Sequence, residues 1–231
     1  MRIAEMDWRM VEDWVRRDDR CVLPLGSTEQ HAGLSLSADT IMAEKLAVDA
    51  AKPLGVPVFP AVPYGLAPHF TGFSGTITLR VATFASLLRD VLDSLKHTGF
   101  RRVLILNGHR GNQAALPLAQ EWMMDNPDAR VRVHNWWCGR MTSAVISRID
   151  SIAGHASWME NFPWTRLPQH EPYDGAKPMV DVDLLRGQPP FEVRLMLDDG
   201  NFGGRYQRDD TEMREIWEVA VSETRALLEE W

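Results

Sequence analysis

The chain has 231 residues, of which 45% are hydrophobic and 25% charged, and its formal net charge is −7. These are ordinary values for a globular protein of one α/β domain, so we expect residues 1–231 to form a single domain. The negative charge argues against nucleic acid or an anionic membrane as the main partner, and it favours a small-molecule substrate.

The cysteines and the N-terminal stretch indicate the cellular compartment of the protein. Cys21 and Cys138 are the only cysteines, and they lie far apart without the spacing of a disulfide framework or a thiolate zinc site. The stretch MRIAEMDWRMVEDW is amphipathic and acidic, whereas a signal peptide would be basic and then apolar. No apolar run is long enough to cross a membrane. These features predict a cytoplasmic protein with no membrane partner.

Helices and strands alternate along the first hundred residues. Apolar spacings of three and four predict helices over residues 7–17, 41–51 and 83–97. Gly99 is placed to end the third of these helices. Residues 56–59 have the composition of a strand, and the glycine-containing loop that follows holds His69. This alternation is typical of an α/β fold.

The first strand leads into a loop rich in possible metal ligands. Residues Cys21–Leu25 form a short apolar run, typical of a buried strand, which breaks at Gly26. The loop after it contains Glu29, His31 and Asp39. Open α/β sheets bind their ligands at the carboxyl ends of the strands, so this loop is our candidate active site.

A second candidate loop follows a central strand. Residues Val103–Leu106 form a continuous apolar run with polar flanks, as expected for a strand buried on both faces. The sequence NGHRGN follows at residues 107–112, and its glycines allow a sharp turn that presents His109 into the same crevice. Residues 113–124 then have the pattern of a helix.

A third set of polar residues lies beyond a further predicted strand at residues 131–136. If a helix begins near Gly154, His155 and Glu160 lie about 140° apart around its axis and would flank a shared centre. The proline-rich stretch 165–210 predicts an irregular excursion, either a lid over the pocket or a contact with a neighbouring subunit. Residues 211–231 close the chain as a predicted helix.

The candidate residues are carboxylates and imidazoles without thiolates, a donor set that suits zinc, manganese or ferrous iron. Two such ions about 3.5–4 Å apart can hold a hydroxide between them and polarise a carbonyl group, so the set predicts a hydrolase. Each residue taken alone also has a plainer interpretation. A Glu-x-His pattern like that of Glu29 and His31 often occurs by chance. Asp39 is also typical of a helix N-cap, and His155 and Glu160 are also typical of a solvated helix face.

Taken together, the motifs resemble the creatininase (creatinine amidohydrolase) family. The strings LPLGSTEQH with a following Asp-Thr, NGHRGN after an apolar strand, and a later HA-x-x-x-E occur in the family's order. The loop at residues 63–76 is similar to the family's Tyr-Gly … Phe-Pro-Gly-Thr segment. The resemblance implies a three-layer α/β/α sandwich with a mostly parallel central sheet. It also implies a homo-oligomer, often hexameric, and a binuclear metal centre that hydrolyses cyclic amides, formamides or related small molecules.

The resemblance also assigns roles to residues. It implies the metal ligands Glu29, His31, Asp39, His109 and Glu160. Asp39 would bridge the two ions, and His155 would protonate the departing atom after a metal-bridging hydroxide attacks the substrate carbonyl. Creatininase has a carboxylate ligand where Gly111 stands here, and Glu160 is the natural replacement.

Departures from the family pattern bear on the substrate. Leu34 stands where the family has a second histidine, so creatinine itself is not the expected substrate. Candidate substrate contacts are His69, Trp136 and Trp158. Indole faces suit the C–H faces of a ring, although packing explains the tryptophans equally well. The leading prediction is cleavage of an amide, lactam or formamide in a cyclic metabolite. The alternatives are hydrolytic C–C opening of a cyclic keto-sugar or keto-inositol, and a non-catalytic metal- or metabolite-binding module.

Overall fold

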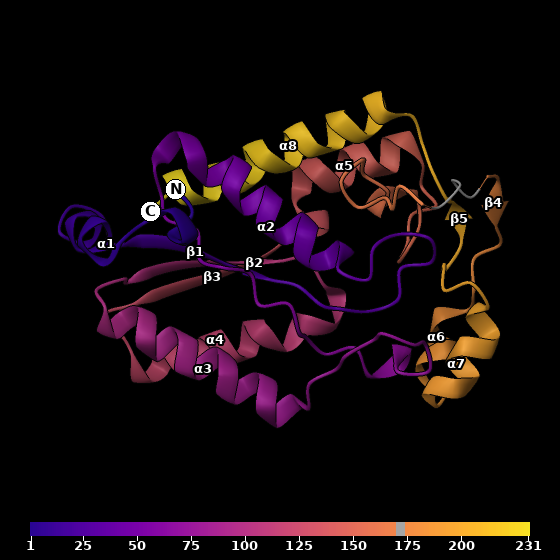
Figure 1. Cartoon of the computed structure of the whole chain (residues 1–231), viewed down its shortest axis with the longest axis horizontal. Coiled ribbons are helices and arrows are strands. Elements are labelled where there is room, and N and C mark those ends of the chain that lie inside the picture. Colours follow the sequence, from indigo (N-terminus) through magenta and orange to yellow (C-terminus); the bar gives the residue numbers. More distant parts are fainter. Residues whose placement is uncertain (170–173) are drawn as a thin grey trace.

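The structure is a computed structural model that describes residues 1–169 and 174–231. At its centre lies a parallel sheet of three strands in the order β1, β2, β3 (Figure 1). The strands are β1 (Arg20–Leu25), β2 (Arg102–Asn107) and β3 (Arg130–Asn135). Their register pairs Leu25 with Asn107 and Asn107 with Asn135, so all three carboxyl ends lie at one edge. The loops after β1 and β2 therefore leave the sheet side by side.

Helices cover both faces of the sheet, which confirms the predicted three-layer α/β/α fold (Figure 1). One layer consists of α2 (Ala38–Ala51), α5 (Arg140–Ile149) and α8 (Asp210–Glu229). The other consists of α3 (Val81–His97) and α4 (Ala115–Asp125). Helix α1 (Trp8–Val15) lies at the end of the molecule remote from the strands' carboxyl edge, and its N-cap Asp7 accepts hydrogen bonds from the amides of Arg9 and Met10.

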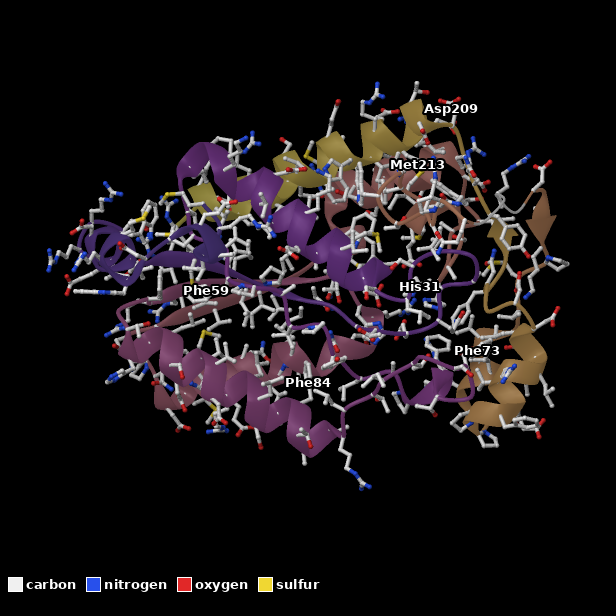
Figure 2. All side chains as sticks on the ribbon, in the orientation of Figure 1. His31, Phe59, Phe73, Phe84, Asp209 and Met213 are labelled. Carbon is white, nitrogen blue, oxygen red and sulfur yellow. The ribbon has the colours of Figure 1, made fainter. Side chains whose placement is uncertain are left out.

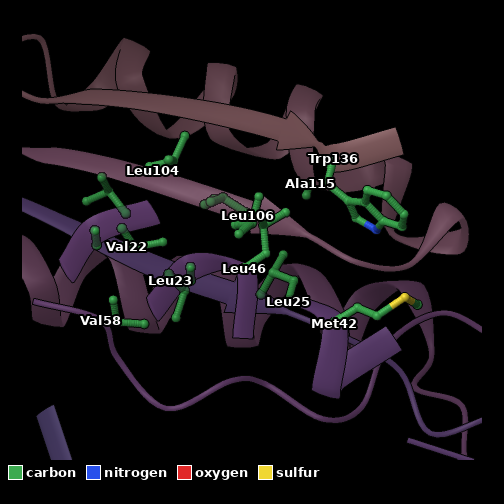
Figure 3. Close-up of a cluster of buried hydrophobic side chains, with 14 of the residues drawn as sticks. Val22, Leu23, Leu25, Met42, Leu46, Val58, Leu104, Leu106, Ala115 and Trp136 are labelled. Atoms are coloured by element: carbon green, nitrogen blue, oxygen red, sulfur yellow. The ribbon is translucent and has the colours of Figure 1, made fainter. Parts of the chain in front are cut away.

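The main hydrophobic core lies between the sheet and these layers. Figure 3 shows the side chains of Val22 and Leu23 from β1 and of Leu104 and Leu106 from β2, packed with Leu46 of α2. All five are at most 2% exposed. Full burial of one such side chain contributes about 1.5–3 kcal/mol. The apolar runs that predicted β1 and β2 are therefore the residues that hold the layers together.

The predicted strand at residues 56–59 is present only as isolated bridges. Val58 forms single parallel bridges with Arg2 and Val22. Proline has no amide hydrogen for a sheet ladder, and Pro57 and Pro60 flank the bridge, so the pairing does not extend into a regular strand.

The stretch 165–210 is more ordered than predicted in the part that the structure describes. It contains α6 (Val182–Arg186), α7 (Pro190–Leu197) and the antiparallel pair β4 (Ala176–Lys177) and β5 (Gly204–Arg205). Leu185, Val193 and Leu197 pack with Ala67 and Phe70 in a second, smaller core. This apolar cluster stabilises α6 and α7. It cannot be recognised from the short, proline-rich sequence of the segment. A role as lid or subunit contact stays a prediction.

Short 3-10 helices lie at Ile3–Glu5, Lys52–Leu54, Pro68–Phe70, Arg110–Ala114, Trp136–Cys138 and Trp158–Glu160. Over residues 1–169 and 174–231, the chain forms no helix with the length and apolar character needed to span a membrane.

Candidate metal centre

Polar side chains from distant parts of the chain meet beyond the carboxyl edge of the sheet. The loop after β1 supplies Glu29 and His31, the first turn of α2 supplies Asp39, and the loop after β2 supplies His109. These four side chains are at most 5% exposed. Glu160 joins them from the 3-10 helix Trp158–Glu160. Figure 2 shows His31 between the sheet and the helices α6 and α7.

Asp39 lies at the centre of this cluster. Its Oδ1 is 3.0 Å from Nε2 of His31, and its Oδ2 is 2.9 Å from Nδ1 of His109. The plainer interpretation of Asp39 as a helix N-cap is wrong, because the N-cap of α2 is Ser37 and Asp39 lies inside the first turn. The two oxygens of one carboxylate thus face two different histidines.

Donor atoms group into two sets that share Asp39. In each set the donor atoms lie within 4.8 Å of one another: Glu29, Asp39 and His109 form one set, and His31, Asp39 and Glu160 form the other. Oε1 of Glu29 is 3.2 Å from Nδ1 of His109, and Oε2 of Glu160 is 3.7 Å from Nε2 of His31. A third set that meets the same limit consists of Glu29, His31 and His155. This cluster of His, Glu and Asp is suited to metal binding.

Two carboxylate oxygens of the cluster are left free for a cation. Oε1 of Glu29 and Oδ2 of Asp39 are buried and have no hydrogen-bond partner among the residues that the structure describes. Nδ1 of His31 lies 3.2 Å from the carbonyl oxygen of Glu29, and Nε2 of His109 lies 3.0 Å from that of Leu66. If each ring donates its N–H to that carbonyl, the other nitrogen keeps a lone pair directed at the carboxylates. Histidine ligands of metal ions are oriented in this way.

The cluster also perturbs the protonation of its members. Burial lowers the pKa of His31, but Asp39, Glu160 and Glu29 outweigh burial and raise the pKa to about 10. Burial also acts to lower the pKa of His109, but Glu29 and Asp39 outweigh it and raise this pKa well above its usual value. Burial raises the pKa of Glu160 to about 7. Burial acts to raise the pKa of Asp39, but His31 and His109 outweigh it and lower this pKa. The site therefore requires positive charge beside its buried carboxylates, a requirement that divalent cations also meet.

Comparison with known proteins settles the family. A family model for creatininase, "Creatinine amidohydrolase", matches residues 4–228. The chain belongs to the creatininase family. The resemblance inferred from the sequence motifs is thus confirmed.

Curated members of the creatininase family show similar segments. A 3-dehydro-scyllo-inosose hydrolase of Thermotoga maritima is 30% identical over 49% of this chain, and a creatinine amidohydrolase of Pseudomonas putida is 30% identical over 64%. A mycofactocin precursor peptide peptidase of Mycolicibacterium smegmatis is 37% identical over 42% of this chain. The chain spans 37%, 62% and 42% of the lengths of these relatives, respectively, which is less than two thirds in each case.

Solved structures of creatininases share the whole fold. A crystal structure of a creatinine amidohydrolase superposes with a TM-score of 0.79 at 22% identity and covers 99% of this chain and 96% of its own. A mutant creatininase described as the Zn-Zn type has a TM-score of 0.80 at 20% identity and covers 99% of this chain and 97% of its own. At these identities the likeness establishes the fold.

Within this creatininase-family fold, His155 lies beside the cluster and between two aromatic rings. Phe70 stacks on the imidazole at 4.5 Å between centroids with an interplanar angle of 13°, and Phe202 meets it edge-on at 5.1 Å. Nδ1 of His155 is 3.7 Å from Oε1 of Glu29. Burial, reinforced by repulsion from His31, lowers the pKa of His155 well below its usual value. The ring is therefore held neutral within reach of the cluster.

The sequence suggested a helix through His155 and Glu160, but the structure does not place these residues on a regular helix. Ala156 has a φ of 57°, which interrupts any helix that begins at Gly154, and only the 3-10 helix Trp158–Glu160 follows. The amide of Ala156 donates to Oε2 of Glu160 at 2.7 Å. The turn nevertheless aims both side chains at the cluster, because Glu160 approaches His31 while His155 approaches Glu29.

Gly111 lies where the structure leaves no room for a side chain. A Cβ atom at Gly111 would collide with the carbonyl oxygen of Leu66 and with Nε2 of His109. A carboxylate side chain at this position would therefore break the hydrogen bond that orients His109. Glu160 has its carboxylate in the donor set with His31 and Asp39, and its role as a replacement ligand stays a prediction.

A cavity of about 390 Å³ opens onto the cluster at Glu29, His109 and His155. His69 lines this cavity, and its role as a substrate contact stays a prediction. The expectation for Trp136 and Trp158 is corrected, because they are 1% and 0% exposed, belong to the main core and do not line the cavity. A sequence pattern cannot separate a buried aromatic side chain from one that faces a cavity.

The sequence analysis missed several residues around the cavity: Gln30, Phe70, Arg110, Arg186 and Phe202. Gln30 and Arg110 lie next to predicted ligands in the chain, and that adjacency was the available signal. Arg186 and Phe202 lie in the 165–210 stretch, where no motif marks them.

Proposed function

We propose that the chain is a metal-dependent hydrolase that uses two divalent ions to cleave a C–N bond in a small cyclic metabolite. The bond would be that of an amide, a lactam or a formamide. The observation that carries the proposal is Asp39, whose two oxygens lie 3.0 and 2.9 Å from the histidines of two separate donor sets. A carboxylate that bridges two ions needs this arrangement. The similarity to a creatinine amidohydrolase, an inosose hydrolase and a peptide peptidase supports hydrolysis.

The proposed ligands follow the two donor sets. Glu29, Asp39 and His109 would hold one ion, and His31, Asp39 and Glu160 would hold the other. Nitrogen and oxygen donors without thiolate suit zinc, manganese or iron, and creatininase structures described as a Zn-Zn type and as a manganese form support this choice. Ions held there would lower the pKa of a water molecule and polarise a substrate carbonyl group.

His155 is proposed to move the proton. Its Nε2 lies 3.0 Å from the carbonyl oxygen of Gln30 and 2.9 Å from the side-chain nitrogen of Gln30, so this residue can accept from or donate to the ring. When Nε2 donates, Nδ1 is a free base beside Glu29. Nδ1 can then take a proton from the attacking water and pass it to the departing nitrogen, so that the ring begins and ends neutral. Phe70 and Phe202 keep the ring in place and exclude water from its faces.

Hydrolytic C–C opening of a cyclic keto-sugar or keto-inositol is the second candidate. Its support is the similarity to the 3-dehydro-scyllo-inosose hydrolase, 30% over 116 residues. The same residues would act, and the proton from His155 would go to a departing carbon atom. A panel of ring amides, formamides and keto-inositols distinguishes the two reactions by the product formed.

Metal analysis tests the proposal against a non-catalytic binding module. We expect about two ions per chain, hydrolysis of at least one ring substrate, loss of activity on chelation and recovery with zinc or manganese. Fewer than one ion per chain, together with no turnover across the panel, would favour the binding module.

Variants separate the roles of ligands and proton carrier. Asp39→Asn should lose at least one ion and the activity. His155→Gln should keep both ions while turnover falls by about 10²–10⁴-fold, the usual contribution of a general acid–base. Asp90→Asn, on the exposed surface of α3, is the matched control and should change neither. Full activity in Asp39→Asn would refute the bridging role.

A further inference from the structure

The charges around the cavity differ from those of the whole chain. Its lining includes Arg110 and Arg186, while Glu29 of the metal cluster is the only carboxylate side chain among the lining residues that the structure describes. The chain as a whole carries a net charge of −7. A positively charged rim on an acidic protein attracts anions locally, because charges within about 8–10 Å act before salt screens them.

Arg110 lines the cavity with an exposed side chain. Its side chain forms no hydrogen bond or ion pair with the residues that the structure describes, although it is exposed and lines the cavity. The backbone on each side is fixed. Oδ1 of Asn107 accepts from the amide of His109 at 3.1 Å, and the side chain of Asn112 bonds Leu66 and Gly26. The guanidinium group is therefore attached to a rigid loop directly beside a proposed metal ligand.

Arg186, at the end of α6, also lines the cavity. Its neighbour Leu185 is 2% exposed and packs with Phe70 and Val193, which fixes the helix against the cavity wall. The only partner of Arg186 among the described residues is Asp183, at 2.9 Å, and both side chains are largely exposed. Such an exposed pair within one helix contributes little, so Arg186 can exchange it for a ligand.

The walls between these arginines and the metal cluster are apolar. Leu66, Ala67, Phe70 and Phe202 line the same cavity. Its volume of about 390 Å³ is within the range of small-ligand sites. The cavity thus combines the proposed metal cluster, apolar walls that suit the faces of a ring, and two arginines at its rim.

We propose that Arg110 and Arg186 bind an anionic group, a carboxylate or a phosphate ester, on the substrate ring whose amide faces the metal cluster. This inference rests on the proposed hydrolase function and specifies its substrate class. Arginine binds both oxyanions through paired N–H donors, and the two guanidinium groups would orient the ring toward the cluster.

Equilibrium binding to the metal-loaded protein tests the anion site without any turnover. The probes are cyclohexanecarboxylate, cyclohexyl phosphate and the neutral cyclohexanecarboxamide, measured by titration calorimetry. We expect the better anion to bind about 10–100-fold more tightly than the carboxamide, as charge-assisted hydrogen bonds predict. The stronger of the two anions identifies the oxyanion. The preference should fall as ionic strength rises.

Four variants assign that preference to the arginines. Arg110→Gln and Arg186→Gln should each reduce it, and the double variant should abolish it. Arg110→Lys should retain part of it because the charge remains. Arg9→Gln, on α1 at the opposite end of the molecule, is the matched control and should leave it unchanged (Figure 1). An anion preference that survives the double variant would mean that the metal ions alone bind the anion, which would overturn the proposal.

A hydrolysis arm separates this proposal from the proposed function. With 5-oxoproline and 2-pyrrolidinone as a charged and a neutral ring amide, Arg110→Gln should raise KM for the charged one and leave its kcat near wild type. No turnover of any ring substrate with an intact anion preference would refute the hydrolase and keep the anion site. Equal turnover of both amides, unaffected by either arginine variant, would refute the anion site and keep the hydrolase.

Discussion

At position 111 a Cβ atom would collide with both the carbonyl oxygen of Leu66 and Nε2 of His109. Glycine has a steric role here, because any side chain would push the ring away from its hydrogen-bond acceptor. The same contact leaves no room for a carboxylate side chain at this position. The carboxylate that we propose as a ligand instead is Glu160, on a different loop.

Replacing Gly111 tests that steric role. Gly111→Ala should destabilise the protein by about 1–3 kcal/mol, the usual cost of overpacking, and should reduce the occupancy of the ion assigned to His109. Thermal unfolding and metal content report the two effects. Gly187→Ala is a matched control, because its Cβ would meet only the carbonyl oxygen of Leu184 at 3.6 Å. Unchanged metal content and stability in Gly111→Ala would contradict the contact.

At the scale of elements, α5 depends on a side chain from α8. Its N-cap Gly139 has no side chain to satisfy the amides of the first turn. Glu223 of α8 accepts instead, at 3.0 Å from the amides of Met141 and Thr142 and at 2.8 Å from the hydroxyl of Thr142. Burial opposes ionisation, but these hydrogen bonds prevail and lower the pKa of Glu223. The ionised carboxylate therefore holds the two helices together.

Stability should depend on pH through this carboxylate. Because its pKa is lower in the folded state, its contribution is complete above the unfolded value of about 4.3 and is lost as pH falls through the folded pKa. Glu223→Gln should cost about 0.5–2 kcal/mol at pH 7. The difference from wild type should shrink below about pH 4. Urea unfolding at several pH values measures it, with Glu229→Gln, at an exposed position of the same helix, as the control. A difference that is independent of pH would contradict this account.

At the scale of the whole molecule, the metal centre joins separate layers. Its proposed ligands come from the loops after β1 and β2, from α2 and from the 3-10 helix that follows α5. An ion bound there would couple the layer of α2 and α5 to the carboxyl edge of the sheet. The single-domain organisation, homo-oligomeric assembly and cytoplasmic location expected from the sequence stay predictions.

Metal removal should therefore lower the thermal stability of the entire domain. Free metal at about 100 times its Kd stabilises the folded state by about 2.7 kcal/mol, which corresponds to roughly 5–10 °C in Tm for a chain of this size. Differential scanning calorimetry with and without a chelator measures the shift, and Asp39→Asn should show little of it. An equal shift in wild type and in this variant would place the stabilising metal elsewhere.

The chain's own sequence determined the α/β class, the long helices, the strands β1 and β2 and the two ligand loops. These features depend on local apolar spacing and on glycines at strand ends, which act over a few residues. Glu29, His31 and His109 were recognisable for the same reason, since each lies in a short motif beside a strand.

Only the tertiary structure decided how those motifs combine. Trp136 and Trp158 lie in the core. Asp39, which the sequence suggested as a helix cap, belongs to two donor sets. Helices α6 and α7 form where the sequence suggested irregular chain. The tertiary structure also brought Arg110 and Arg186, remote in sequence, to one cavity. These outcomes depend on contacts between distant segments, whose burial and distances no local pattern encodes.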